Sequence, residues 1–160
     1  MGLIALPVFN SPNGLQVIEK ATIDLETGRM QGGPIAALLR DPSLGDDLKN
    51  EFFKAQMRLA LKEAFEVCKT YCKNTQQFQN MRGTSWYHFA RIVRDAVTHD
   101  FHIDTENKES RLLPLTWRYW TITPEMTGKQ VSAGLKGFIS HRLVDETMAA
   151  YTRFIQTEAL

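Results

Sequence analysis

Residues 43–74 read SLGDDLKNEFFKAQMRLALKEAFEVCKTYCKN, and most of their apolar side chains recur at steps of three and four. This spacing is typical of an amphipathic α-helix with one buried face. We expect the helix to be capped by Ser43, to carry Asp46 and Asp47 in its early turns, and to run to about Asn74. Its inward face is predicted to hold Leu48, Phe52, Met57, Leu61, Ala64, Cys68 and Tyr71.

Two more helices are expected on the C-terminal side of this one, after a polar loop over residues 74–83. Thr84 or Ser85 should cap the first of them, which places Phe89, Ile92, Val93, Ala96 and Val97 on the buried side. The other should span roughly Ser132 to Thr157, with Leu135, Phe138, Ile139, Val144, Met148, Tyr151 and Ile155 facing inward. On the N-terminal side, Pro34 favours a short helix that stops before Pro42, while Leu15 to Leu25 fit a helix or short strands equally well.

A segment of different character separates the last two long helices. Residues 115–123, LTWRYWTIT, are rich in strand-forming residues, and Gly128 marks a later turn. They predict a small hairpin or an extended aromatic flap. The fold class is therefore all-α, an antiparallel helical bundle with this inserted hairpin or flap. Residues 1–42 are predicted to form an N-terminal arm or cap, and residues 43–160 the bundle, within one domain overall.

Composition restricts the possible functions. The 160 residues are 43% hydrophobic and 23% charged, with a formal net charge of +1, so any anion-binding site must be local. Cys68 and Cys72 lie one helical turn apart, which favours buried thiols over a disulfide framework or half of a metal site. The apolar start is ended by Pro7 and has no basic residues before it, and no apolar run has membrane-spanning length. We therefore expect a cytoplasmic protein without a membrane segment.

The strongest chemical signal is the stretch Arg94-Asp95-Ala96-Val97-Thr98-His99 near the end of the second helix. A fixed cation near a group that titrates around neutral pH suffices for cleavage of an RNA phosphodiester without metal. Arg82, His88 and Arg91 lie upstream, and no acidic residue occurs between Glu66 and Asp95. The sequence therefore predicts a positive local field that binds phosphate. On a straight helix Arg94 and His99 point in different directions, so we expect them to share a phosphate only if the helix frays at His99 or a second copy approaches.

Residues 86–99, WYHFARIVRDAVTH, resemble the HEPN superfamily, in which an Arg followed by a polar residue precedes a His by four to six positions late in a bundle helix. The resemblance covers roughly Ser43 to Thr157. It implies a homodimeric, metal-independent endoribonuclease without cofactor, with a composite site, often a toxin or a phage-defence component. Arg94 would neutralise the phosphate, His99 would assist proton transfer, and Asp95 would orient one of them. Arg91, Arg82 and His88 would add phosphate contacts, and an antitoxin or nucleotidyltransferase partner would control the activity.

Several alternatives stay open at this stage. HEPN-like domains also act as non-catalytic interaction or regulatory modules, so Arg94 and His99 are equally read as solvated surface residues. A metal-dependent phosphohydrolase of the HD type would use His88, the pair His99-Asp100, His102, Asp104 and perhaps Asp145. Trp86, Tyr87, Trp117, Tyr119 and Trp120 are able to stack on RNA bases, although packing against the bundle is favoured for the aromatics of residues 117–120.

Overall fold

The computed structural model describes residues 11–25, 28–41, 43–105, 109–134 and 137–158. The protein is mostly helical, as the periodicity predicts, and its short strands pair in two-stranded antiparallel sheets. Cα proximity divides the chain into two compact units, one ending at Gln56 and the other beginning at Met57. The arm boundary expected at residue 42 stays a prediction.

The first unit contains α2 (Pro12–Lys20), the hairpin β1 (Thr22–Leu25) and β2 (Gly28–Gln31), and α3 (Gly32–Arg40). Ser11 caps α2 by accepting a hydrogen bond from the backbone N–H of Gly14 at 2.9 Å. A Cβ at Gly32 would lie 1.7 Å from the carbonyl oxygen of Ile18, so the packing of α2 on α3 requires glycine there. The short helix expected around Pro34 is therefore confirmed as α3.

Helix α4 (Gly45–Asn74) ends where the sequence predicts, and Asp46 and Asp47 lie in its first turn. The expectation that Ser43 caps it is wrong, because the Ser43 hydroxyl donates instead to Asp41 Oδ1 at 2.6 Å. The predicted inward face is also partly wrong, since Leu48 is 39% exposed. The buried side chains of this helix are Phe53, Met57, Leu61, Phe65, Cys68 and Cys72.

Helices α5 (Phe78–Gly83) and α6 (Tyr87–Thr98) follow. The predicted polar loop is wrong because the fully buried Met81 and the Phe78–Tyr87 ring contact anchor α5. The predicted cap on α6 is wrong as well, since the Thr84 hydroxyl donates to the Met81 carbonyl and α6 begins at Tyr87. The predicted buried face of α6 is confirmed for Phe89, Ile92, Val93, Ala96 and Val97.

The last helix, α7 (His141–Arg153), is capped by Ser140 and is followed by a π-helical turn, Phe154–Glu158. It begins nine residues after the predicted start at Ser132. Gly134 has a φ of 142°, and a Cβ at Gly137 would lie 2.6 Å from the Ser132 carbonyl oxygen, so this segment turns instead of coiling. Ile139, Val144 and Tyr151 are buried as expected, Phe138, Met148 and Ile155 are half-buried, and Leu135 lies outside the described residues.

The predicted hairpin is confirmed as β4 (Leu115–Trp117) and β5 (Trp120–Ile122), with Trp117 opposite Trp120. Trp117 is 6% exposed, and its ring centre lies 5.5 Å from that of Phe89, so the hairpin packs on α6. A second antiparallel pair, β3 (His102–Ile103) with β6 (Lys129–Gln130), was not predicted, because two-residue strands are too short to produce an alternating pattern.

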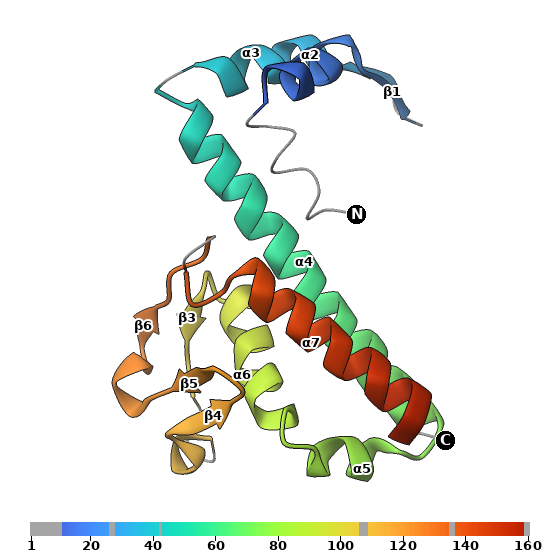
Figure 1. Cartoon of the computed structure of the whole chain (residues 1–160), viewed down its shortest axis with the longest axis vertical. Helices are drawn as coiled ribbons and strands as arrows, with labels where there is room; N and C mark the ends of the chain where they lie inside the picture. The colour runs from blue at the N-terminus through green and yellow to red at the C-terminus, as the bar shows by residue number, and fades with distance from the viewer. Residues whose placement is uncertain (1–10, 26–27, 42, 106–108, 135–136, 159–160) are drawn as a thin grey trace. The chain divides into compact units, whose positions relative to one another are not determined.

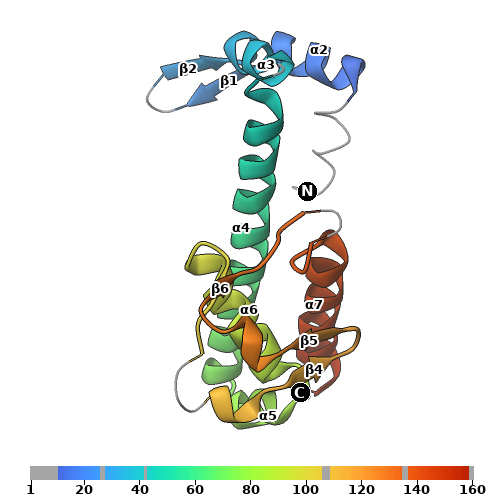
Figure 2. The same ribbon diagram turned by 90° about the vertical axis from the view of Figure 1, so that its left-hand side faces the viewer.

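In the second unit α6 runs back along the C-terminal half of α4, and α7 runs in the same direction as that half (Figures 1 and 2). Phe65 lies at the centre of this packing, with ring centres 5.9 Å from Tyr87 on α6 and 6.2 Å from Tyr151 on α7. The three helices thereby share one aromatic core, and the polar side of α6 is left at the surface.

Candidate functional site

Helix α6 carries the predicted motif on its polar side. Its buried face is continuous, and Arg91, Arg94 and Asp95 are half-buried between that face and solvent. His99 is exposed and ends the helix, with a φ of −109° and a ψ of 50°. Its backbone N–H still donates to the carbonyls of Asp95 and Ala96. The helix therefore ends at His99, as a site shared with Arg94 requires.

Arg94 and His99 line one pocket of about 270 Å³, which also contains Arg91, Asp95, Asp104 and Glu109. We call it the Arg-His pocket. It joins the end of α6 to the segment that follows β3, and it brings together four of the six residues that the sequence singled out. Arg82 and His88 do not line it.

The Arg94 guanidinium is held by two carboxylates and one ring. Its Nη1 lies 2.6 Å from Asp95 Oδ1, its Nη2 lies 3.2 Å from Glu66 Oε1, and its Cζ lies 5.2 Å from the Phe65 ring centre. The side chain is 22% exposed. Asp95 thus orients Arg94, which is one of the two roles the sequence left open for it.

The predicted positive field of the pocket is wrong. Asp95, Asp104 and Glu109 contribute three carboxylates against the two guanidinium groups of Arg91 and Arg94. Glu109, 5% exposed, lies with its Oε1 3.0 Å from Arg91 Nε. The sequence reasoning counted charge along α6 only, whereas Glu66, Asp104 and Glu109 come from segments distant in sequence and contact α6 or line the pocket through tertiary packing.

Glu66 shows how the charges balance. Burial alone raises the pKa of its carboxyl group, but the hydrogen bond and charge of Lys69, together with the charges of Arg94 and Lys73, bring the pKa below its ordinary value. Glu66 therefore stays ionised at neutral pH beside Arg94. Sequence reasoning missed this residue, and only its position on the predicted α4 helix could have indicated it.

His88 and Arg82 lie upstream of the pocket. His88 is half-buried on α6, and its Nδ1 is buried without a hydrogen-bond partner among the residues that the structure describes. Burial, followed by the nearby charges of Arg91 and Arg82, lowers the pKa of His88 below its ordinary value of 6.5. Arg82 is exposed at the end of α5. His88 is thus a neutral packing residue at physiological pH.

We expect His88 to make folding sensitive to mild acid. Its pKa is lower in the folded protein, so the unfolded chain binds more protons as the pH falls below 6.5, and the free energy of unfolding falls with it. Urea unfolding of the wild type at pH 6.5 and about one unit lower should show this loss, and His88→Gln should reduce it. Equal pH dependence in both proteins would contradict the assignment.

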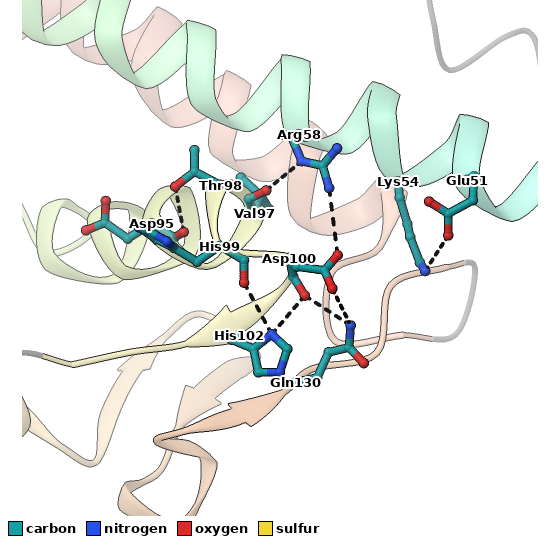
Figure 3. A network of polar contacts seen from close by, with 10 residues as sticks. All are labelled: Glu51, Lys54, Arg58, Asp95, Val97, Thr98, His99, Asp100, His102 and Gln130. Atoms are coloured by element: carbon teal, nitrogen blue, oxygen red, sulfur yellow. Dashed lines mark hydrogen bonds and ion pairs between the residues drawn. The ribbon is translucent and has the colours of Figure 1, made fainter.

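The turn after α6 is held by residues that the sequence did not indicate (Figure 3). Asp100 and Phe101 have φ angles of 51° and 62°, which side chains other than glycine rarely adopt, and Phe101 is 1% exposed. Arg58 Nε donates to the Val97 carbonyl at 2.8 Å, and its guanidinium lies 5.5 Å from the Phe101 ring centre. The side chain of Gln130 donates to the Asp100 carbonyl at 3.0 Å. These contacts set where the backbone leaves α6, and therefore where His99 lies.

Arg58→Met is expected to lower the free energy of unfolding by roughly 1–2 kcal/mol, because the carbonyl of Val97 loses a charged donor that is only partly exposed. Urea denaturation measures the change, and amide hydrogen exchange should show that it opens the turn at Asp100. Lys62→Met is the matched control on α4, because exposed Lys62 pairs only with its neighbour Glu63 among the described residues. The two substitutions having the same effect would exclude a specific role for Arg58.

The residues proposed for an HD-type metal site do not gather. His102 Nδ1 lies 3.1 Å from the Asp100 carbonyl oxygen, so its ring faces backbone. Among the described residues, no three His, Cys, Asp or Glu side chains are placed to hold one metal ion. Cys68 and Cys72 are buried, as predicted, and burial followed by the influence of Cys72 raises the pKa of the Cys68 thiol to about 12.

The aromatic residues divide into two groups. Trp86, Tyr87 and Trp117 are 7%, 5% and 6% exposed and pack in the core, which excludes full stacking of a base on their faces. Tyr119 is 73% exposed, and its ring centre lies 4.3 Å from the Arg142 guanidinium. The hairpin therefore presents one aromatic ring and several polar groups to solvent.

Comparison of the chain with protein-family models, curated proteins and solved structures found no match. Within the described residues, none of the helices combines the length and apolarity needed to cross a bilayer. The functional argument therefore depends on the geometry of the two pockets of the second unit.

Proposed function

We propose that this protein is a metal-independent endoribonuclease of the HEPN type, which acts as a homodimer with a composite Arg/His site. The observation that supports the proposal most directly is that Arg94 and His99 line the same pocket although they lie five residues apart on the helix. The alternating directions of α4, α6 and α7 agree with the antiparallel bundle that the resemblance implies.

The reaction requires little from the protein, because RNA carries its own nucleophile. His99 would accept the proton of the 2′-hydroxyl as the O2′–P bond forms and the P–O5′ bond breaks, and the 5′-oxygen would take up a proton from the second imidazole of the dimer. Arg94, and with it Arg91, would stabilise the charge that develops on the phosphorane oxygens. The products are a 2′,3′-cyclic phosphate and a 5′-hydroxyl.

Incubation of the purified protein with single-stranded RNA in EDTA tests the proposal. We expect cleavage that leaves cyclic phosphate ends and is unchanged by the chelator. A protein that cleaves no RNA, or cleaves only with added divalent metal, would contradict it. Sedimentation in the same buffer should give a dimer, since each composite site needs two copies of α6.

A second candidate is a non-catalytic HEPN-like interaction or regulatory domain. It is favoured by the engagement of both pocket arginines, Arg91 with Glu109 and Arg94 with Asp95 and Glu66, because a phosphate must compete with these carboxylates. In this case RNA stays intact, and substitution of the exposed Tyr119 should weaken partner binding.

The biological setting is also part of the proposal. A ribonuclease of this type fits a cytoplasmic toxin or phage-defence component that is controlled by an antitoxin or nucleotidyltransferase partner. Co-expression provides the check: toxicity on expression should require His99, and it should disappear when the partner is supplied.

A further inference from the structure

A second pocket of about 400 Å³ lies away from the motif, where three segments distant in sequence meet. Ser85 and Trp86 precede α6, Thr116 to Arg118 end β4, and Ala150 and Arg153 belong to the last turn of α7. We call it the hairpin pocket. Its volume falls in the range of small-molecule and nucleotide sites, which is about 300–1,000 Å³.

The charge of the hairpin pocket is opposite in character to that of the Arg-His pocket. Its lining contains two guanidinium groups, Arg118 and Arg153, and no carboxylate. Arg118 Nη1 lies 2.6 Å from Glu146 Oε2, outside the lining. Arg153 has no carboxylate within ion-pair distance in the described part of the chain. The hydroxyls of Ser85 and Thr116 add donors, and two tryptophans form an apolar wall.

The backbone at Arg118 gives an independent indication of a ligand. Arg118 and Tyr119 form a two-residue hairpin loop, and Arg118 has a φ of 51°. Glycine is the residue that such a position favours, since it adopts positive φ without steric cost. Strained residues of this kind cluster at ligand-binding sites. The side chain of Arg118, which lines the pocket and lies 5.5 Å from the Trp117 ring centre, accounts for the choice of arginine over glycine.

We propose that the hairpin pocket binds one nucleotide of the single-stranded RNA substrate, outside the bond that is cut. Arg118 and Arg153 hold its phosphate from two sides, a geometry suited to guanidinium groups. The exposed edges of Trp86 and Trp117 contact the base, and the hydroxyls of Ser85 and Thr116 contact the sugar and phosphate. This inference rests on the proposed ribonuclease function and specifies where its substrate binds.

The test measures binding without cleavage. A fluorescently labelled oligouridylate in which every 2′-hydroxyl is methylated cannot be cut by 2′-oxygen attack. Its fluorescence anisotropy is titrated with wild type, Arg153→Gln, Arg118→Gly and the control Arg111→Gln, which removes one exposed positive charge outside the pocket. We expect Arg153→Gln and Arg118→Gly each to weaken binding at least tenfold and Arg111→Gln to change it less than threefold, about the range for a lost phosphate contact.

Arg118→Gly separates a ligand role from a structural one. Relief of the positive φ offsets the lost ion pair with Glu146, so the melting temperature should stay within about 4 °C of the wild type while binding is lost. Unchanged binding by both variants, equal loss in Arg111→Gln, or no binding by the wild type would each overturn the proposal.

The outcome is independent of the cleavage site. His99→Ala should bind the methylated oligonucleotide as the wild type does. Binding that depends on Arg153 in a protein that cuts no RNA would support the hairpin pocket and contradict the nuclease. Cleavage in a protein whose binding ignores both arginines would support the nuclease and contradict the pocket.

Discussion

His99→Ala is expected to lower the rate of RNA cleavage by about 10²–10⁴-fold, the usual contribution of a general acid or base. The imidazole is the clearest position to test, because His99 is exposed at the end of α6 and its removal leaves no buried group unpaired. Arg94→Ala would also abolish cleavage, but it would leave Glu66 and Asp95 without their partner and lower stability as well.

His102→Ala is the matched control for His99. Its ring lies three residues further on, at the surface, and contacts the backbone of the same turn. Single-turnover cleavage, with circular dichroism to confirm folding, should place the loss at His99 and leave His102→Ala within a few-fold of the wild type. A full rate in His99→Ala, or an equal loss in both variants, would remove the catalytic assignment.

Phe65→Ala is expected to lower the free energy of unfolding by about 3–5 kcal/mol. The ring is fully buried, contacts Tyr87 and Tyr151, and carries the Arg94 guanidinium on its face. Alanine would leave a cavity where α4, α6 and α7 meet, and it would also loosen the position of Arg94. Chemical denaturation gives the first effect, and a rise in KM for RNA reports the second.

Two further variants separate packing from stacking. Val67→Ala lies on the same helix at 64% exposure and should change stability by less than about 0.5 kcal/mol. Phe65→Leu keeps most of the volume but removes the ring below Arg94, so it should cost less stability than alanine and still raise KM. A loss in Val67→Ala as large as that in Phe65→Ala would contradict the burial of this face.

The long helices were predictable because their apolar spacing is a local property. The end of α4 at Asn74 and the buried face of α6 follow from periodicity alone. Caps were less predictable. Ser43 and Thr84 are good capping residues by type, yet each hydroxyl hydrogen-bonds to a nearby acceptor before its helix begins. The start of α7 was missed because Gly134 and Gly137, both compatible with the helical pattern, are needed in a tight turn.

The candidate site was predictable only in its α6 residues. Arg94, Asp95 and His99 share one helix, so their proximity could be inferred from sequence. Glu66, Asp104 and Glu109 reverse the expected charge of the region, and they do so through contacts between segments distant in sequence. Arg58, which holds the end of α6, has the same origin. A sequence without its tertiary contacts gives the residues of a site more readily than its electrostatics.

The consecutive left-handed residues Asp100 and Phe101 affect when the site forms during folding. Neither residue favours that conformation in a free chain, and the groups that compensate for it come from α4 and from β6. The turn therefore becomes stable only after these segments have docked, which makes the placement of the imidazole a late event. A nascent chain that has emerged only as far as α6 would hold the motif in sequence and lack the assembled pocket.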